Sequence, residues 1–554
     1  MLKKTDIIPM KSKISFIKQR FILSLLAILT PILAFCQEPA AKGIDQQIDE
    51  AFTPFSNLVQ SIIFFSIPLG NNVGIPIVLI VLILGALFFT IYFGFPNIKH
   101  LPLAIRTVRG DYYNPDATTE VIVPNDNVRQ DIIDDMPDTI RDESADGEVT
   151  PFQALTAALS ATVGLGNIAS VAVALSVGGP GATFWMILAG ILGMSSKFAE
   201  CTLGVKYREI DQDGTVHGGP MYYLKKGLEE KGLGALGKVF AVFFAIMCIG
   251  GSFGGGNMFQ ANQAAIQFLN VIYGDASAIP MSAKTIFGLI VAFLVGIVII
   301  GGIKRIGQVT EKVVPFMAVL YVGAALIVLF MNIGLIPTAF GLILEGAFAP
   351  TAIAGGIIGV LIQGFQRAAF SNEAGVGSAA IAHSAVRTSH PASEGMVALL
   401  EPFIDTVIIC TMTALVLIIT NIEGQFMVYG QKADGVSATS AAFSSSLPGA
   451  EYILTVAVVL FAFSTMLSWS YYGLQAWKFL FGKSKRADII YKLLFCTFVV
   501  IGAAASLDSV IGFSDAMIFA MVFPNVIGLL ILAPVVKEEV AKYIAYTKTY
   551  QKPD

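Results

Sequence analysis

A glycine-rich interruption in an apolar segment carries the first residues suited to binding a small solute. The run VGLGN at 163–167 interrupts a helix predicted over 151–176. Gly164 and Gly166 allow an unwound backbone without the steric cost of a Cβ atom, and Asn167 is a residue type that caps a helix N-terminus. N–H groups freed there, at the positive end of a half-helix, suit a carboxylate group. We therefore expect this interruption to contact a substrate.

Oxygen ligands for a cation are available at the same place and in one later helix. The backbone carbonyl groups of Ala161 and Val163 are freed where the first half-helix ends, and such carbonyls suit sodium. In the helix predicted over 451–475, Ser464 and Thr465 are adjacent hydroxyls at mid-depth. Two alternatives remain open: the glycines only permit close helix packing, and the hydroxyls only bond to carbonyls of their own helix.

A second helix, predicted over 351–379, is also interrupted. The interruption is expected around IQGF, which contains Gln363 and Gly364, and again at SNEAGVGS. Gln363 and Gly364 are therefore candidate substrate contacts. Arg367 and Glu373 flank this break, and we expect them to stabilise the inner gate. The same role is expected for Lys197 with Glu200 and for Glu401 with Asp405.

Three further side chains complete the predicted pocket. Asn257 and Gln260 are three apart on one face of the helix predicted over 238–271, where they could bind an ammonium group or the unwound backbone. Polar contacts between helices are an equally good interpretation. Trp469 shares a helical face with Thr465 and is expected to form a wall. No Asp or Glu is expected at mid-depth, so a charged substrate side chain would be desolvated without a partner.

These residues must be positioned by membrane-spanning helices. The chain has 554 residues, of which 55% are hydrophobic and 13% are charged, whereas soluble proteins carry about 25% charged residues. Apolar runs recur at about the 20 residues that a helix needs to cross a bilayer. We predict eleven spans, at about 73–95, 151–176, 181–205, 238–271, 284–303, 312–332, 351–379, 395–420, 451–475, 488–506 and 511–535.

The two interrupted helices are five spans apart, so they take matching places in two five-helix halves of opposite orientation. Paired broken helices in an inverted repeat indicate the binding site of a transporter, because unpaired backbone in a membrane must line a cavity or meet protein. We predict an all-α fold with repeats at 151–335 and 351–535. An amphipathic connection at 336–350 joins them, and an additional transmembrane helix at 73–95 precedes them.

The N-terminal 36 residues have the order of a signal peptide. Basic residues precede a short apolar stretch, and a cleavage point before Gln37 follows. A lipid anchor on Cys36 and an uncleaved extra helix are the alternatives. The mature N-terminal segment, 37–72, is expected in the periplasm.

Charge asymmetry predicts the orientation. The predicted outer segments contain three basic residues, and the inner segments are rich in Lys and Arg. The acidic loop at 96–150 and the tail at 536–554 are therefore expected in the cytoplasm of a bacterium, with the protein in its inner membrane. The three outer basic residues are Lys42, Lys284 and Lys432.

Several classes of function find no support in the sequence. GLGNIA matches a dinucleotide fingerprint but lies in an apolar span with no preceding strand. No catalytic triad, phosphate-binding loop or CxxC pair is present, and no basic surface suggests nucleic acid. The four histidines lie in or beside polar segments, so a buried histidine centre is not expected. No acidic series crosses the bilayer centre, which disfavours a proton relay.

Four long strings resemble the alanine or glycine:cation symporter family, the sodium/alanine symporters. They are PFQALTAALSATVGLGNIASVAVALSVGGPGATFWM, GGPMYYLKKGL, GGIKRIGQVTEKVVPFMAVLY and FQRAAFSNEAGVGSAAIAHSAV. The resemblance runs from about 75 to 535. It implies a LeuT-like core with one extra helix in front, and cotransport of sodium with alanine, glycine or a similar small neutral amino acid. The residues carried over are Thr162, Gly164, Gly166 and Asn167, with Thr465 and Trp469 opposite.

The chain departs from the family pattern at a few positions. Leu165 and Ser170 stand where Thr and Gly are usual, and the signal-like segment and acidic loop are additional. Transport of another amino acid such as glutamine, proton coupling, and a membrane sensor that binds an amino acid therefore remain alternatives. The expected partners are the small neutral amino acid and the lipid bilayer. The sequence does not specify an oligomeric state.

Overall fold

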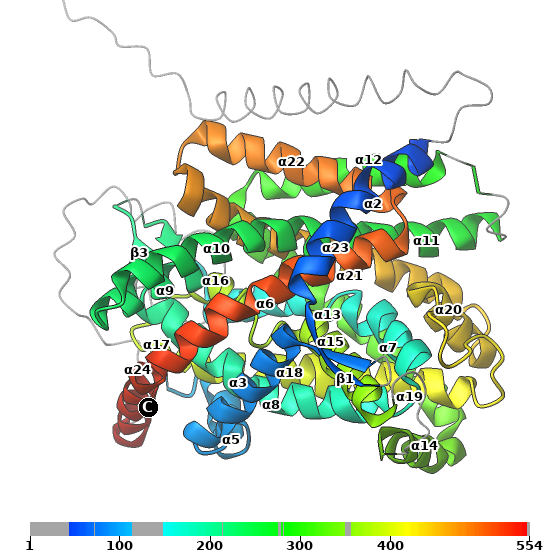
Figure 1. Ribbon diagram of the computed structural model, residues 1–554, viewed down its shortest axis with the longest axis horizontal. Coiled ribbons are helices and arrows are strands. Elements are labelled where there is room, and N and C mark those ends of the chain that lie inside the picture. The colour runs from blue at the N-terminus through cyan, green and yellow to red at the C-terminus, as the bar shows by residue number, and fades with distance from the viewer. Residues whose placement is uncertain are drawn as a thin grey trace, which may run out of the picture.

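The structure is a computed structural model, and helices dominate it (Figure 1). It describes residues 44–70, 73–112, 148–212, 214–274, 279–280, 282–348 and 356–550. The predicted signal peptide and most of the acidic loop lie outside these ranges. Two short antiparallel hairpins accompany the helices, β1 (Ser66–Gly70) with β2 (Val73–Pro76) and β3 (Glu209–Ile210) with β4 (Val216–His217).

The helices of the first repeat begin with a broken pair. An N-terminal capping box starts the first of them, because the Thr150 side chain accepts from the Gln153 N–H while the Gln153 side chain accepts from the Thr150 N–H. The two halves of the pair are bent by 44°. The elements are α6 (Pro151–Thr162), the π-helix η2 (Gly166–Ser170), α7 (Val171–Gly178), α8 (Ala182–Lys206), α9 (Pro220–Glu230), α10 (Gly234–Phe253), the π-helix η3 (Gly254–Met258), α11 (Phe259–Tyr273), α12 (Ala283–Ile299) and α13 (Gly302–Met331).

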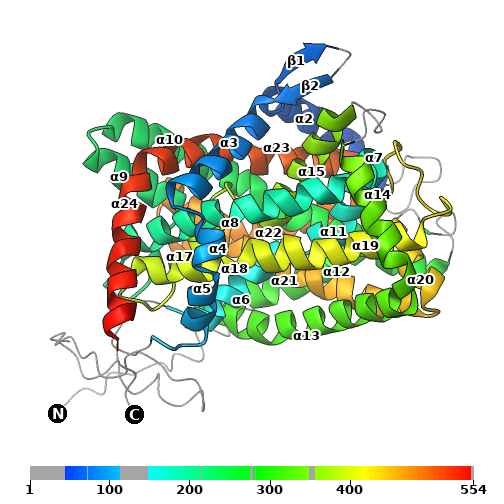
Figure 2. The ribbon, with the colours of Figure 1, turned by 90° about the horizontal axis from the view of Figure 1, so that it is seen from below.

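The second repeat follows a short helix, α14 (Ile336–Phe348), which packs on α8 and α19. In Figure 2 the long helices of both repeats lie side by side in one bundle. The elements are α15 (Gly356–Asn372), α16 (Ala379–His383), α17 (Pro391–Ala398), α18 (Leu400–Pro402), the π-helix η6 (Phe403–Cys410), α19 (Thr411–Thr420), α20 (Gly435–Ser446), α21 (Ala450–Phe481), α22 (Lys485–Ala504), α23 (Leu507–Ala520) and α24 (Val522–Thr549).

Elements before the first repeat cover one side of the bundle. They are α2 (Ile44–Ile63), α3 (Ile77–Tyr92), α4 (Pro96–Lys99) and α5 (Leu101–Val108). The helix α2 packs along α23, where Ser56 Oγ donates to the Ser509 carbonyl at 2.7 Å and the rings of Phe52 and Phe513 meet edge to face. The helix α3 lies between α8 and α24.

The described helices cross a membrane several times. Seven helices or uninterrupted helix runs are long and apolar enough to span, and the bent pair at α6 and α7 makes an eighth. Shorter apolar helices include α3 and α12. Large apolar side chains point outward, among them Val239, Ile290 and Val319, with exposed fractions of 64%, 56% and 73%. This apolar surface suits lipid, and the chain is a multi-pass α-helical membrane protein.

The second break does not lie where the sequence predicted its start. The helix α15 continues through residues 362–365, and the chain leaves the helix only at Glu373, Gly375 and Gly377, which all have positive φ. The predicted interruption around IQGF is therefore wrong. Gly364 serves helix packing, because a Cβ atom there would lie 2.5 Å from Trp185 Cβ. A glycine that permits close approach of two helices resembles, in sequence, one that breaks a helix.

Candidate functional site

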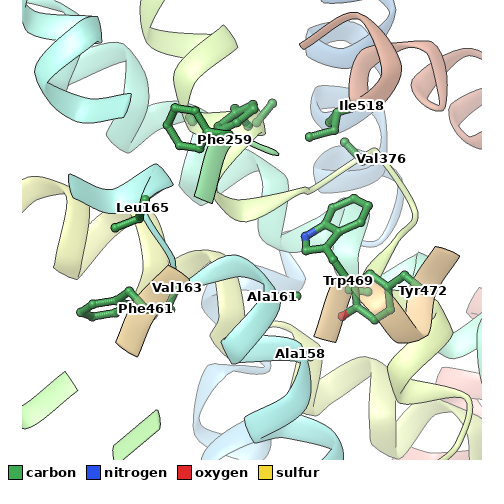
Figure 3. Packing of buried hydrophobic residues seen from close by; sticks show 14 of the residues in the cluster. Ala158, Ala161, Val163, Leu165, Phe259, Val376, Phe461, Trp469, Tyr472 and Ile518 are labelled. Carbon is green, nitrogen blue, oxygen red and sulfur yellow. The ribbon is translucent and has the colours of Figure 1, made fainter. Parts of the chain in front are cut away.

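A small cavity lies in the middle of the bundle, where the two breaks meet α21, α23 and the π-helix η3. Figure 3 shows the Trp469 ring between Ala161 of α6 and Ile518 of α23. Six of the predicted site residues contribute to its lining, together with three that the sequence did not single out. The lining residues are Ala161, Thr162, Gly166, Gly255, Gln260, Phe370, Glu373, Trp469 and Ile518.

Side chains hold the first break in its unwound form. The Gly164 N–H donates to Asn167 Oδ1 at 2.9 Å, and the Leu165 N–H donates to Gln260 Oε1 at 3.1 Å. Gln260 also donates through Nε2 to the Gly255 carbonyl at 2.9 Å. Gln260 therefore supports the break and lines the cavity, whereas the Asn167 side chain turns away from the cavity.

Asp405 of η6 is a buried acid next to the first break. Its Oδ1 accepts from Asn167 Nδ2 at 2.6 Å, and its Oδ2 accepts from Ser371 Oγ at 2.9 Å and from Thr406 Oγ1 at 2.7 Å. The side chain is fully buried, and these donors are all neutral. From the sequence we expected Asp405 to stabilise the inner gate together with Glu401. The sequence signal that could have indicated a role at the site is the presence of an ionisable residue within an apolar span.

One hydroxyl of the predicted pair, that of Thr465, lies against the end of α6. Thr465 Oγ1 donates to the Ser160 carbonyl at 2.8 Å, and a Cβ atom on Gly164 would lie 2.5 Å from Thr465 Oγ1. Ser464 Oγ instead donates to the Phe461 carbonyl of its own helix at 3.1 Å. Thr465 is thus close to the carbonyls of the break, while Ser464 makes the back-bond that was the alternative.

Glu373 occupies the wall of the cavity beside Trp469. The Trp469 indole Nε1 donates to Glu373 Oε1 at 2.9 Å, and Ser378 Oγ donates to the second carboxylate oxygen. The expectation that no acid lies at mid-depth is therefore wrong. From the sequence, Glu373 was expected at the inner gate. Spacing along the chain does not show which helix a residue within a break will contact.

Comparison with known proteins identifies the class of protein to which this cavity belongs. A family model described as the sodium:alanine symporter family matches residues 127–554. The chain belongs to this family. It is therefore a cation-coupled amino-acid symporter, a transporter by class.

Curated relatives of this symporter carry several substrate names. The sodium/alanine symporter AgcS of Methanococcus maripaludis is 38% identical over 480 residues, which cover 86% of this chain and 96% of the relative. The probable sodium/glutamine symporter GlnT of Bacillus subtilis is 35% identical, with 73% and 80% covered. The putative sodium/proton-dependent alanine carrier protein YrbD of Bacillus subtilis is 35% identical, with 71% and 80% covered.

A solved structure confirms the predicted fold class. The crystal structure of MhsT in complex with L-phenylalanine superposes with a TM-score of 0.50 at 16% identity. The match covers 70% of this chain and 89% of MhsT. The symporter therefore has the LeuT-like fold of five plus five helices, with α3 as an additional helix in front.

Arg367 of the symporter pairs with Asp515 of α23 and not with Glu373. The guanidinium donates to Asp515 Oδ2, and Gln366 Nε2 donates to the same oxygen at 3.0 Å. The guanidinium also lies 5.4 Å from the centre of the Phe370 ring, which lines the cavity. Arg367 and Glu373, which were expected to stabilise the inner gate together, thus have separate partners, and Arg367 joins α15 to α23 beside Phe370.

Besides Gly164 and Asn167, three predicted substrate contacts and the predicted sodium ligand Val163 lie outside the cavity lining. Asn257 Nδ2 donates to the Phe495 carbonyl at 2.7 Å, which is the helix-to-helix contact given as its alternative. Gln363 lies against Gly178, and Gly364 packs on α8. Val163 is buried at the C-terminal end of α6. These positions support the helices around the site.

A buried ionic network replaces the two other predicted pairs. Lys197 Nζ lies 3.1 Å from Glu401 Oε2, and both side chains are fully buried. His383 is also fully buried, with Nδ1 3.0 Å from Glu394 and Nε2 beside Glu401. Glu200 accepts from Asn525 instead, at 2.8 Å. These contacts join α8 to α16 and α18. They correct two expectations: Lys197 pairs with Glu401 and not with Glu200, and His383 is buried among helices and not in a polar segment.

A second set of contacts holds the segment before α6 against β4 and the residues that follow α16. The Val216 N–H donates to Glu148 Oε1 at 2.7 Å, and the Val149 N–H donates to the Ala385 carbonyl at 3.2 Å. Burial raises the pKa of the Glu148 carboxyl above its ordinary value. Arg208 Nη1 donates to the Ser384 carbonyl at 2.9 Å. The strand β4 and the end of α16 therefore both fasten the segment that leads into the first break.

Proposed function

We propose that the symporter imports alanine, glycine or a similar small neutral amino acid together with sodium, by alternating access. The observation that carries this proposal is the cavity at the junction of both breaks, with backbone of the first break on one side and the Trp469 ring on the other. A site between two broken helices suits a solute with an ammonium and a carboxylate group. The relative named as a sodium/alanine symporter supports the choice of substrate.

Contacts to the amino acid come from the cavity lining. Thr162 and Gly166 of the first break and Gln260 of α11 face the substrate, and Trp469 limits its side chain. Gly164 and Asn167 act indirectly, because their hydrogen bond fixes the form of the break. Lysine and tryptophan are excluded mainly by the size of their side chains, since Glu373 places a carboxyl group in the wall that could accept from a lysine ammonium group.

Sodium has two groups of candidate ligands beside this cavity. Thr465 Oγ1 and the carbonyls at the end of α6, from Ser160 to Val163, form the first. Asp405 is the central residue of the second, since its buried carboxylate accepts only neutral donors from Asn167, Ser371 and Thr406 within the described chain. A buried negative charge gains most from a cation placed against it.

Uptake into proteoliposomes tests the substrate and the ion together. We expect an inward sodium gradient to drive accumulation of labelled alanine, with strong competition by glycine and weak competition by lysine, glutamate and tryptophan. Potassium in place of sodium, with and without an imposed proton gradient, is the control for the ion. Accumulation driven by protons alone would contradict sodium coupling. Stronger competition by glutamine than by glycine would contradict the proposal that the substrate has a small side chain.

Orientation can be tested separately from transport. We propose that the protein lies in the bacterial inner membrane with the mature N-terminus outside and the C-terminus in the cytoplasm, as the Lys and Arg distribution predicts. A cysteine introduced at Ser437, in α20, is expected to react with an impermeant thiol reagent added to intact cells. A cysteine at Ser484, beside the start of α22, is expected to react only after lysis. The reverse labelling would contradict the orientation.

A further inference from the structure

The hydrogen bond between Trp469 and Glu373 joins a wall of the cavity to the second break. Trp469 belongs to α21, whereas Glu373 directly follows α15. Glu373 Oε1 accepts from the indole at 2.9 Å, and its other oxygen accepts from Ser378 Oγ, immediately before α16. Both Trp469 and Glu373 line the cavity and are buried, with exposed fractions of 2% and 1%. One carboxylate thus connects α21, the break and α16.

The backbone at Glu373 shows that its side chain has a specific use. Its φ of +56° lies in the left-handed region, which a residue with a Cβ atom seldom adopts. The next positions with positive φ in this break are Gly375 and Gly377, where the conformation costs nothing. A glycine at 373 would satisfy the backbone equally well but would leave the buried Trp469 indole without this acceptor.

Apolar packing restricts the position of the Trp469 ring, but it supplies no hydrogen-bond acceptor for the indole N–H. A Cβ atom on Gly256 would lie 2.1 Å from Trp469 Cγ. The first atoms of the Trp469 side chain therefore pack directly against the backbone of η3. Tyr472 meets the indole edge to face, with ring centres 5.3 Å apart. These contacts are apolar. Within the described residues, Glu373 is the group that orients the polar edge.

We propose that Glu373 is a positioning residue that determines specificity: it holds the Trp469 indole as the wall of the substrate cavity. This inference rests on the proposed function and extends it to the selection of a small side chain. Without the acceptor, the buried indole N–H loses its partner and the ring favours other positions. The cavity then admits larger neutral side chains.

Competition against labelled alanine uptake tests this role. In Glu373→Ala, we expect the ratio of leucine to glycine inhibition to rise at least fivefold. Glu373→Gln keeps an oxygen acceptor and is expected to retain the original ratio. Tyr472→Phe is the matched control, because the Tyr472 hydroxyl has no hydrogen-bond partner among the described residues while its ring contact is retained.

A double-variant cycle separates this role from general damage to the fold. Trp469→Phe removes the donor and is expected to raise the leucine ratio by itself, even if Glu373→Ala does not fold. Adding Glu373→Ala to Trp469→Phe is then expected to change the ratio less than twofold. An equal effect of Glu373→Ala in both backgrounds would show that Glu373 does not act through the indole, and an unchanged ratio in all variants would overturn the proposal.

A spectroscopic measurement makes the test independent of transport. The chain contains three tryptophans, so replacing Trp185 and Trp477 by Phe leaves Trp469 as the sole indole. Glu373→Ala is expected to shift its emission maximum, and Glu373→Gln is not. If wild-type protein fails to transport alanine but the shift occurs, the proposed substrate is wrong and the coupling of Glu373 to Trp469 stands. Alanine transport without any shift would overturn the coupling.

Discussion

Asp405→Asn is expected to raise the sodium concentration for half-maximal uptake at least tenfold, or to abolish sodium-driven uptake. The substitution keeps the shape of the side chain but removes a negative charge that meets only neutral donors from Asn167, Ser371 and Thr406. Two unit charges 4 Å apart interact by about 4 kcal/mol at an effective dielectric constant of 20. A loss well below that value already corresponds to a tenfold weaker cation affinity. Initial rates of alanine uptake across a sodium titration measure the effect.

Two further variants show whether the effect of Asp405→Asn is specific to a carboxylate at the cation site. Asp508→Asn removes a carboxylate that is 82% exposed and pairs with Lys432, so it is expected to leave the sodium requirement unchanged. Thr465→Val removes one neutral hydroxyl ligand and is expected to raise the requirement by a smaller factor, roughly threefold, as a loss of about 0.7 kcal/mol implies. A folded Asp405→Asn protein with the wild-type sodium dependence would exclude Asp405 from the cation site.

The first break could be predicted from the sequence because its signal is local. Gly164 and Gly166 stand within an apolar run, and Asn167 follows them as an expected helix cap. In the structure Asn167 lies inside η2 and does not cap it, because its Oδ1 accepts from the Gly164 N–H of the break. No tertiary information is needed to see that such a run unwinds readily. The structure places the end of α6 and the bend at these residues. The partners of the break were less visible, since Gln260 reaches it from 95 positions away along the chain.

The roles of Asp405, Glu373 and Arg367 depend on contacts between helices, and the sequence placed them less well. Each was expected at the inner gate together with a charged residue nearby in the chain: Asp405 with Glu401, and Arg367 with Glu373. In the structure Arg367 reaches Asp515 across 148 positions, and Trp469 reaches Glu373 across 96. In a buried bundle the cost of an unpaired charge selects the partner, whatever its distance in the sequence.

Glycines posed the same difficulty for another reason. Gly364 and Gly166 are both small residues in apolar runs, yet one packs against α8 and the other lines the cavity. Absence of a side chain permits either unwinding or close approach, and only the neighbouring helix decides between them. For this reason Gln363 and Gly364, which were predicted as substrate contacts, lie outside the cavity lining. The actual break lies within SNEAGVGS, the other place in this helix where the sequence predicts an interruption.

Gly256→Ala is expected to abolish alanine uptake and to lower the thermal stability of the purified protein. A Cβ atom there would lie 2.1 Å from Cγ and 2.3 Å from Cβ of Trp469. The position of Cβ does not depend on the rotamer, so a change of rotamer cannot relieve the overlap, and α21 or η3 must shift. Overpacking of this kind typically costs about 1–3 kcal/mol, and here it also displaces the cavity wall.

Gly323→Ala is the matched control, because a Cβ atom at Gly323 in α13 meets nothing within 4 Å. This variant is expected to keep both uptake and stability, since alanine favours a helix over glycine by about 1 kcal/mol. Combining Gly256→Ala with Trp469→Gly removes both Cβ and Cγ of residue 469 and with them the overlap, so thermal stability is expected to recover partly while selectivity for small amino acids does not. If Gly256→Ala transports alanine as well as Gly323→Ala does, the Trp469 ring cannot pack on the backbone of η3 during transport, and the wall of the cavity must be formed by another residue.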